Sequence, residues 1–181
     1  MTATRLTLEA VAHIAVAAGL VATGWQLSLA NDHRRVDATL GFQRALGQEP
    51  LAGMQRELTE RWLEFRETVS VMRSGAISAP NIAAFTREVV YGRAGETQQM
   101  DLTPAVIGIV RNLDQMAVCV GAGLCDCDLA FKHFSEYAAE VHSAYDPIIQ
   151  DVKATFGEST LGQDLEHFVE ASTCEELLHY Y

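Results

Sequence analysis

Apolar residues recur at helical spacing along three segments of this chain. In residues 54–73 successive apolar positions lie three or four residues apart, and the same spacing returns in residues 106–120 and 131–152. This spacing places apolar side chains on one face of a helix. The three faces consist of Met54, Leu58, Trp62, Phe65, Val69 and Met72; of Val106, Val110, Leu113, Ala117 and Val120; and of Phe131, Phe134, Ala138, Val141, Tyr145, Ile148 and Val152. No segment shows sustained alternation of apolar and polar residues, so we predict an all-α fold without a sheet.

Capping residues divide the chain after residue 35 into a helical bundle of about four to five helices. Ser78 with Pro80 in the first turn predicts a helix that runs to about Tyr91. Thr103 followed by Pro104 predicts the start of another helix. Further caps are predicted at Asp126 or Asp128, at Thr160 with Gln163, and at Ser172 with Glu175.

Glycine and proline predict where helices end or bend. The N-terminal helix is expected to end near Gly47 and Pro50, and the helix over residues 54–73 to stop at Gly75. Residues 92–100 contain two glycines and a polar run, which predicts an exposed loop. Pro147 predicts a kink in the helix that begins after Asp126.

The N-terminal segment is a candidate membrane anchor. Residues 10–30 form a run of 21 residues without a formally charged side chain, and about 20 helical residues cross the hydrocarbon core of a bilayer. Trp25 lies near the end of this run, where an indole suits the headgroup region. We therefore predict a single transmembrane helix within an anchor of residues 1–35, followed by a helical domain of residues 36–181. The alternatives are a signal peptide cleaved after Ala30 and a buried helix of a soluble protein.

The charges beside this run predict its orientation. Arg34 and Arg35 follow it directly, whereas Arg5 is the only basic residue before it. Positively charged flanks of a membrane helix tend to stay in the cytoplasm. We therefore predict a single-pass protein whose C-terminal domain lies in the cytoplasm.

Small residues form a possible packing face on the anchor. Ala15, Gly19 and Thr23 are spaced four residues apart, and such a face lets two helices approach closely in lipid. This pattern favours packing against another membrane protein subunit or against a second copy of the chain. The alternative is chance, because the whole run is rich in alanine.

Charge is distributed unevenly along the chain. The formal net charge is −11; residues 1–111 hold 11 basic and 11 acidic residues, whereas residues 112–181 hold two lysines and 13 acidic residues. The chain has no basic stripe to neutralise phosphates, which argues against nucleic acid as a partner. The acidic C-terminal part is either a solvated surface or a docking surface for a basic partner.

The four cysteines show no familiar metal-binding spacing. Cys119, Cys125 and Cys127 form a C-x5-C-x-C pattern without the C-x2–4-C element typical of zinc sites. We interpret them as ordinary, partly buried thiols that a cytoplasmic domain would keep reduced. The alternatives are a metal site and a redox pair, and Cys174 has no obvious partner.

Other combinations of reactive residues favour no chemistry either. His133, Glu136 and Glu140 share one helical face, but the Glu-x-x-His repeat of di-iron bundles is missing. No nucleophile elbow or phosphate-binding loop occurs in the sequence. We therefore predict a protein that is not an enzyme, with no catalytic, cofactor-binding or metal-binding residues.

The segment NLDQMAVCVGAGLCDCDL, residues 112–129, resembles a bacterial family of membrane-anchored helical proteins classed only as a domain of unknown function, number forty-seven sixty. The residues that match the family's pattern are Asn112, Ala117, Gly121, Gly123, Asp126, Phe131, Tyr145 and the run LEHF at 165–168. Gln115, Cys125 and Cys127 depart from it. The resemblance covers the anchor and residues 105–170, and it implies a helical domain behind an anchor in the bacterial inner membrane. It implies no chemistry, because the family carries no established activity.

These observations predict a non-enzymatic accessory, assembly or scaffold subunit that acts through helix contacts. Its partners would be membrane lipid and other membrane protein subunits or a second copy of itself. The candidate interaction residues are Trp62, Phe65, Phe131 and Phe134, which face a common core if their two helices pack together. The alternatives are a membrane-anchored effector of bacterial stress or phage defence that oligomerises, and a metal or redox protein that uses the cysteines.

Overall fold

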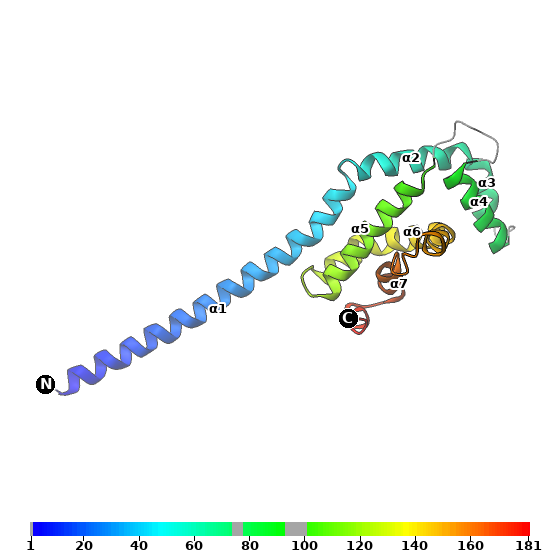
Figure 1. Ribbon diagram of the computed structural model, residues 1–181. Coiled ribbons are helices and arrows are strands. Elements are labelled where there is room, and N and C mark those ends of the chain that lie inside the picture. The colour runs from blue at the N-terminus through cyan, green and yellow to red at the C-terminus, as the bar shows by residue number, and fades with distance from the viewer. Residues whose placement is uncertain (1, 74–77, 93–100) are drawn as a thin grey trace.

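The computed structural model describes the backbone of residues 2–73, 78–92 and 101–181 and the side chains of residues 19–71, 78–92 and 101–181. Within these ranges the chain is helical and has no strand, as predicted. The helices are α1 (Thr2–Leu46), α2 (Leu51–Glu64), α3 (Arg66–Arg73), α4 (Ala79–Tyr91), α5 (Thr103–Gly121), α6 (Cys127–Phe156), α7 (Gln163–Glu170) and α8 (Cys174–Leu178). Figure 1 shows α2 to α8 gathered into a bundle from which α1 projects.

Helix α5 forms the centre of the bundle. It packs against α1, α2, α6, α7 and α8, and its buried positions include the whole face predicted for residues 106–120. The helix starts at Thr103 as predicted, although the side chain that caps it is Asp101, whose carboxylate accepts a hydrogen bond from the Thr103 N–H at 2.8 Å. Because its apolar face is covered from several sides, α5 is the element on which the other helices are positioned.

Helix α6 covers one side of α5. Asp126, one of the two predicted caps, is its N-cap and accepts a hydrogen bond from the backbone N–H of Leu129 at 2.9 Å. The helix continues through Pro147 to Phe156 and ends at Gly157, which adopts a left-handed conformation with φ of 72°. A residue without a Cβ adopts this conformation at little cost, which explains the stop.

The segment predicted as one helix over residues 54–73 is two helices, and this prediction was wrong. The helix is interrupted at Phe65, where φ is −105° and ψ is 18°. The break coincides with the docking of α4, because the Trp62 and Phe65 rings both pack edge-on against the ring of Phe85. Together with short separate helices near the C-terminus, this break gives seven described helices after α1 instead of four to five.

Other boundaries agree with the sequence patterns. Helix α4 begins after Ser78 and ends at Tyr91, and α1 ends just before Gly47, as predicted. The predicted stop at Gly75 and most of the predicted loop over residues 92–100 lie outside the described residues.

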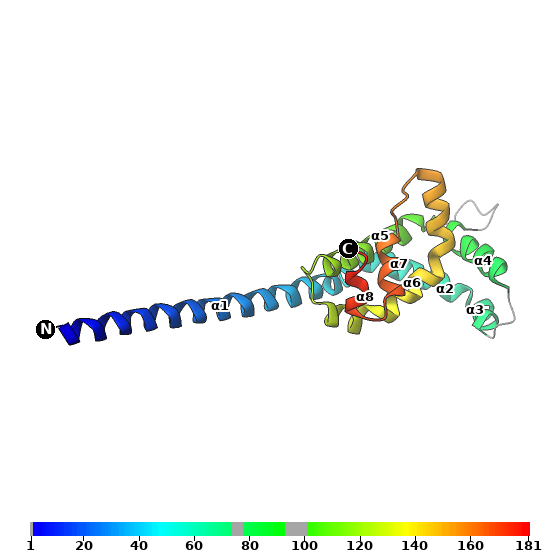
Figure 2. The same ribbon diagram turned by 90° about the horizontal axis from the view of Figure 1, so that it is seen from below.

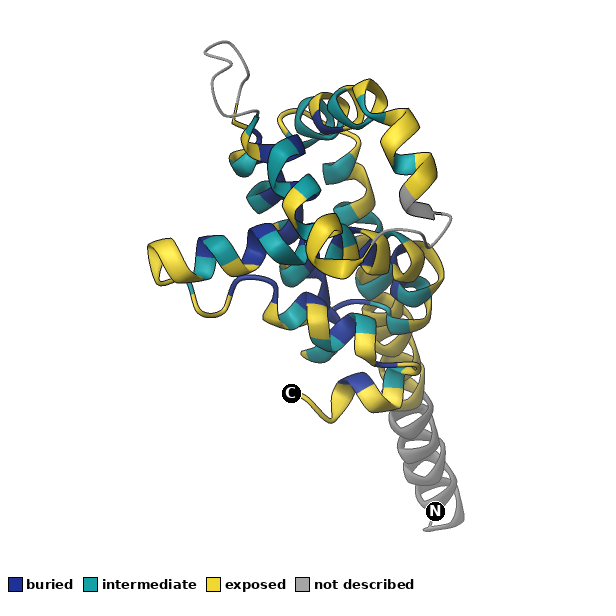
Figure 3. Ribbon diagram, turned by 90° about the vertical axis from the view of Figure 1, so that its right-hand side faces the viewer, coloured by how far each residue is buried: buried dark blue, intermediate teal, exposed yellow. Residues whose placement is uncertain are grey.

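Helix α1 contains two contrasting stretches. Every side chain of residues 19–34, the projecting stretch, is exposed, whereas packing begins at Arg35 in residues 35–46, the docked stretch. Figures 1 and 2 show the helix leaving the bundle without a break, and Figure 3 shows exposed residues on its visible part nearest the bundle. Among the residues that the structure describes, no helix combines the length and apolar character needed to span a bilayer. The transmembrane prediction is not supported by this finding and enters below as a proposal.

Candidate functional site

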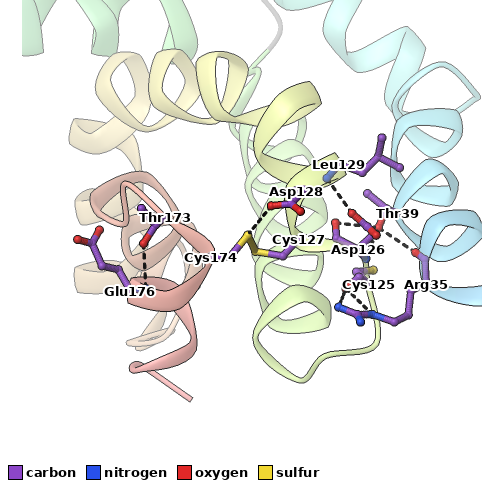
Figure 4. Close-up of a disulfide and its surroundings, with 10 residues drawn as sticks. All are labelled: Arg35, Thr39, Cys125, Asp126, Cys127, Asp128, Leu129, Thr173, Cys174 and Glu176. Carbon is purple, nitrogen blue, oxygen red and sulfur yellow. Dashed lines mark hydrogen bonds between the residues drawn. A yellow bond between two sulfur atoms is a disulfide. The ribbon is translucent and has the colours of Figure 1, made fainter. Parts of the chain in front are cut away.

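The docked stretch of α1 is fastened to the turn between α5 and α6. Thr39 is fully buried, and its hydroxyl accepts a hydrogen bond from the Asp126 N–H at 2.8 Å while lying 3.0 Å from the Arg35 carbonyl oxygen, to which it donates. The Arg35 guanidinium donates to the carbonyl oxygen of Cys125 from Nε at 3.3 Å and from Nη2 at 3.2 Å. Figure 4 shows these contacts in one cluster. The point at which α1 leaves the bundle is therefore fixed by polar contacts.

A disulfide closes the turn that receives α1. Cys119 in the last turns of α5 is bonded to Cys125, and their Cα atoms lie 5.2 Å apart. The chain reverses at Gly123, whose φ is 68°, and the backbone N–H groups of Leu124 and Cys125 both donate to the Cys119 carbonyl oxygen at 3.0 Å. The hydrogen bonds and the disulfide together hold Cys125 where Arg35 contacts it.

A second disulfide attaches the C-terminal helix to the same region. Cys127 at the start of α6 is bonded to Cys174 at the start of α8, with Cα atoms 5.8 Å apart. Helix α8 is capped by Thr173, whose side-chain oxygen accepts a hydrogen bond from the Glu176 N–H at 3.2 Å, one residue later than the predicted Ser172 cap. Figure 4 shows both cysteines beside the capped start of α6.

These disulfides overturn the predicted state of the cysteines. The structure holds no free cysteine, so the prediction of ordinary thiols and of an unpartnered Cys174 was wrong. The C-x5-C-x-C spacing did not predict the Cys119–Cys125 disulfide, because these two cysteines become neighbours only after the chain reverses at Gly123. The second bond joins residues 47 positions apart and depends on the packing of α7 and α8 against α6.

Asp114 on α5 organises the start of α7, and sequence reasoning missed it. Its carboxylate accepts hydrogen bonds from the backbone N–H groups of Gly162 at 2.7 Å and Leu165 at 2.9 Å, at the start of α7. Burial raises the pKa of Asp114 despite these two bonds. The carboxylate thus replaces the cap that the sequence placed at Thr160, because the N-cap residue of α7 is Gly162.

A surface cavity of about 560 Å³ lies beside Asp114. Its charged lining groups have partners within the fold: Arg111 donates to both carboxylate oxygens of Glu158, and Asp164 accepts a hydrogen bond from the Tyr181 hydroxyl at 2.6 Å. These groups hold the α6–α7 connection and the C-terminus in place. The charged groups of the cavity are therefore engaged within the fold.

The predicted anchor residues lie on the projecting stretch or at its base. Gly19, Thr23, Trp25 and Arg34 are exposed, whereas Arg35 is half-buried in the contact with Cys125. The Thr23 hydroxyl donates to the Gly19 carbonyl oxygen at 2.8 Å, within the helix. Ala15 lies before the first residue whose side chain is described. The face of small residues is therefore open where the structure describes it.

Three of the four predicted interaction residues share the core: Phe134 belongs to it, and Trp62 and Phe131 pack against it, whereas Phe65 packs on Phe85 of α4. Phe134 is buried with 2% of its surface exposed, and Trp62, Phe65 and Phe131 are half-buried. Helix α2 faces α6 through hydrogen bonds: the Trp62 indole N–H donates to the Tyr145 hydroxyl at 2.8 Å, and Gln55 donates to the Tyr137 hydroxyl at 2.7 Å. The ring of Phe131 stacks instead on Phe168 of α7.

The candidate metal ligands from the sequence are dispersed. His133, Glu136 and Glu140 are all exposed on α6. Within the described residues, no three His, Cys, Asp or Glu side chains gather in a way that could hold a metal ion.

The geometry defines an all-helical bundle that carries one long projecting helix, with two disulfides where that helix emerges. No family model, no curated protein and no solved structure matches the chain. The resemblance to the family of unknown function therefore stays an expectation from the sequence.

Proposed function

We propose that this chain is a membrane-anchored scaffold or accessory subunit, in which α1 inserts into lipid and the bundle is held at the membrane surface to bind partner subunits. The observation that carries the proposal is the exposure of the projecting stretch. Leu20, Val21, Trp25 and Leu27 lie there with 67–72% of their surfaces exposed.

Transfer from water to lipid would stabilise the projecting stretch, because it removes exposed apolar side chains from water. Exposed apolar side chains cost free energy in water in proportion to their area. A helix also meets the second requirement of a bilayer, since its backbone groups bond to one another within the segment. The helix needs no partner from the bundle to enter the membrane, which fits its unbroken course from the bundle outwards (Figure 2).

The disulfides favour a different side of the membrane from the one predicted by Arg34 and Arg35. Disulfides persist in oxidising compartments, whereas cytoplasmic thiols are kept reduced. Both disulfides lie in the bundle and all four cysteines take part in them. In addition, Arg35 has a structural role in the folded chain, because it bonds to the Cys125 carbonyl oxygen. We therefore propose that the bundle lies outside the cytoplasm, with the N-terminus of α1 inside.

The non-enzymatic part of the proposal draws on the polar contacts of the bundle. Several of them connect a helix to another segment of the bundle, as Thr39, Asp114 and Arg111 do. Their side chains determine the shape of the bundle, and shape is what a scaffold presents to a partner.

Membrane fractionation of the full chain tests the anchor. We expect the protein to stay with membranes after carbonate extraction, and we expect Leu20→Glu combined with Val21→Glu to release it. Leu63→Glu is the matched control, because Leu63 is a similarly exposed apolar residue on the bundle. Release of the unaltered protein by carbonate would refute the anchor.

Protease protection together with thiol alkylation tests the side of the membrane. We expect a protease added outside sealed spheroplasts to digest the bundle, and we expect alkylating reagent to label no cysteine before reduction. Four labelled cysteines and a protected bundle would restore the cytoplasmic location.

The open face around Gly19 favours a second candidate, the oligomerising effector. Its helices would pair in lipid through the small residues. Gly19→Leu would then disperse the oligomer and abolish any toxicity on overexpression. A scaffold subunit would instead co-purify with its partner at fixed stoichiometry and leave overexpressing cells healthy.

A further inference from the structure

The end of the bundle beside the base of α1 carries exposed apolar and aromatic side chains. Leu124 lies in the α5–α6 turn with 66% of its surface exposed, and Val118, Leu178, Tyr180 and Tyr181 are exposed as well. Figures 1 and 2 both show the α5–α6 turn and the C-terminus on the side from which α1 projects. We call these five residues the end patch.

The turn presents Leu124 on a rigid support. Cys125 beside it is bonded to Cys119, and the Leu124 N–H donates to the Cys119 carbonyl oxygen at 3.0 Å. Residues 115–125 contain no charged side chain, although they belong to the part of the chain that carries the whole net charge of −11. An uncharged tip in an otherwise acidic region can contact lipid without desolvating a charged group.

The C-terminal tyrosines extend the end patch from the turn. The Tyr181 ring lies so close to Gly121 that a side chain there would overlap it. Its hydroxyl donates to Asp164 at 2.6 Å, and the Tyr180 ring stacks on His167 at 4.3 Å between centroids. Tyrosine rings with one apolar body and one polar tip are characteristic of membrane interfaces.

The attachment of α1 sets the height of the end patch above the hydrocarbon core. The apolar run ends at Ala30, and Arg35, which contacts Cys125, lies five residues further along α1. Five residues of helix rise about 8 Å. The headgroup layer of one leaflet is roughly 5–8 Å thick, given about 30 Å of hydrocarbon in about 40–45 Å of bilayer. The turn next to Arg35 therefore falls at the level of the headgroups.

We propose that the end patch rests in the headgroup region of a zwitterionic phospholipid bilayer, as a second membrane contact that fixes the orientation of the bundle on its anchor. This inference rests on the membrane anchoring proposed above. Zwitterionic lipid is favoured because aspartates near the patch would be repelled by an anionic surface. Asp126 follows Leu124 by two residues, Asp128 contacts Cys174 at the start of α8, and Asp164 bonds to Tyr181.

Tryptophan fluorescence in reconstituted full-length protein tests the proposal. Leu124→Trp and Phe156→Trp are compared in a chain that also carries Trp25→Phe, so that only Trp62 is a shared background. Phe156 is the matched control because it is 69% exposed at the end of α6, away from the base of α1 (Figure 2). The vesicles consist of phosphatidylcholine with or without a spin label on the headgroup, which quenches nearby indoles.

We expect Leu124→Trp to lose fluorescence in spin-labelled vesicles and to emit at shorter wavelength than in detergent, whereas Phe156→Trp changes in neither respect. Equal quenching of the two variants, or none at Leu124→Trp, overturns the second contact. A blue shift at Leu124→Trp without quenching also overturns it and identifies a second copy of the chain as the occupant. Trp25 in the unaltered protein separates the membrane anchor from the headgroup contact of the end patch. If the protein floats with vesicles and acyl-chain labels quench Trp25, the anchor is supported whatever Leu124→Trp shows. If the unaltered protein does not float with vesicles, both the anchor and the headgroup contact are refuted.

Discussion

The projecting and docked stretches of α1 belong to one unbroken helix, yet they face different surroundings. The docked stretch buries Thr39 and bonds to the α5–α6 turn through Arg35. The projecting stretch exposes every side chain, including Trp25 and several aliphatic residues. The helical backbone is the same in both stretches, so the difference lies in the side chains and in what surrounds them.

The pattern of apolar and polar residues also differs between the two stretches. A helix on a bundle needs one apolar face and a polar one. The docked stretch meets this requirement, because Ala38, Phe42 and Leu46 pack on the core while Arg44 is exposed. In the projecting stretch apolar residues occur around the helix, which is typical of a segment surrounded by lipid or by other helices.

The largest expected effect compares the core of the bundle with the projecting stretch. Phe134→Ala should lower the free energy of unfolding by about 3–5 kcal/mol, because it removes a fully buried aromatic ring. Trp25→Ala removes an even larger ring but should change the unfolding of the bundle by less than about 0.5 kcal/mol. Both are measured by denaturant unfolding of the full chain in mild detergent. An equal loss in the two variants would show that the projecting stretch packs on the bundle.

The two disulfides differ in their expected contribution because they close loops of different length. In the chain-entropy model, the 47-residue separation of Cys127 and Cys174 corresponds to about 4 kcal/mol, and the six-residue separation of Cys119 and Cys125 to about 2 kcal/mol. We therefore expect Cys127→Ser with Cys174→Ser to lower stability more than Cys119→Ser with Cys125→Ser. The reverse order would indicate that the turn beneath α1 contributes more than its loop entropy.

Local patterns in the sequence predicted much of the fold. The α4 boundaries, the Asp126 cap and the apolar face of α5 could be predicted because capping and helical spacing involve residues within a few positions of each other. The interruption at Phe65 could not, because it coincides with a contact between Phe65 and the ring of Phe85 on another helix, which no local pattern shows.

The polar contacts and disulfides that complete the bundle could not be predicted either, because they too join residues that are far apart in the sequence or meet only when the chain reverses. Asp114 caps α7 from α5, across 48 positions of sequence, so no local capping pattern reveals it. Nothing in the sequence distinguishes Thr39 from another threonine in a long helix, because its partner, the Asp126 N–H, lies far away along the chain. The disulfides required the reversal at Gly123 and the docking of α8.

A pair of threonines gives a direct test of the two stretches of α1. Thr39 and Thr23 each lie within hydrogen-bond distance of the carbonyl oxygen four residues earlier, but only Thr39 is buried and accepts the Asp126 N–H. Thr39→Val should cost about 1–3 kcal/mol, because it leaves a buried donor with poorer partners. Thr23→Val should change stability by less than about 0.5 kcal/mol. If both substitutions were neutral in denaturant unfolding, the Asp126 contact would not hold α1 to the bundle.

The smallest expected effect is a pH dependence confined to the bundle side of this comparison. Arg87 of α4 donates to both carboxylate oxygens of Asp151 on α6, from Nε at 2.7 Å and Nη2 at 2.9 Å. These hydrogen bonds lower the pKa of Asp151 below its ordinary value, and a hydrogen bond from the Tyr91 hydroxyl adds to the effect. The unfolded chain therefore binds a proton at higher pH than the folded one, so the pair stabilises the fold above the ordinary pKa of aspartate.

This stabilisation should disappear as the pH falls through the lowered pKa of folded Asp151. The difference in unfolding free energy between the unaltered protein and Asp151→Asn should accordingly be largest near neutral pH and vanish in acid. Its size should stay small, because the ion pair is partly exposed to solvent. The difference between the unaltered protein and Thr39→Val should hold constant over the same range, since a threonine hydroxyl does not titrate there. The opposite result would be that acid diminishes the unfolding free-energy difference for Thr39→Val and leaves that for Asp151→Asn unchanged. In that case the contact that holds α1 would depend on a carboxylate, and the base of the projecting helix would be the pH-sensitive part of the molecule.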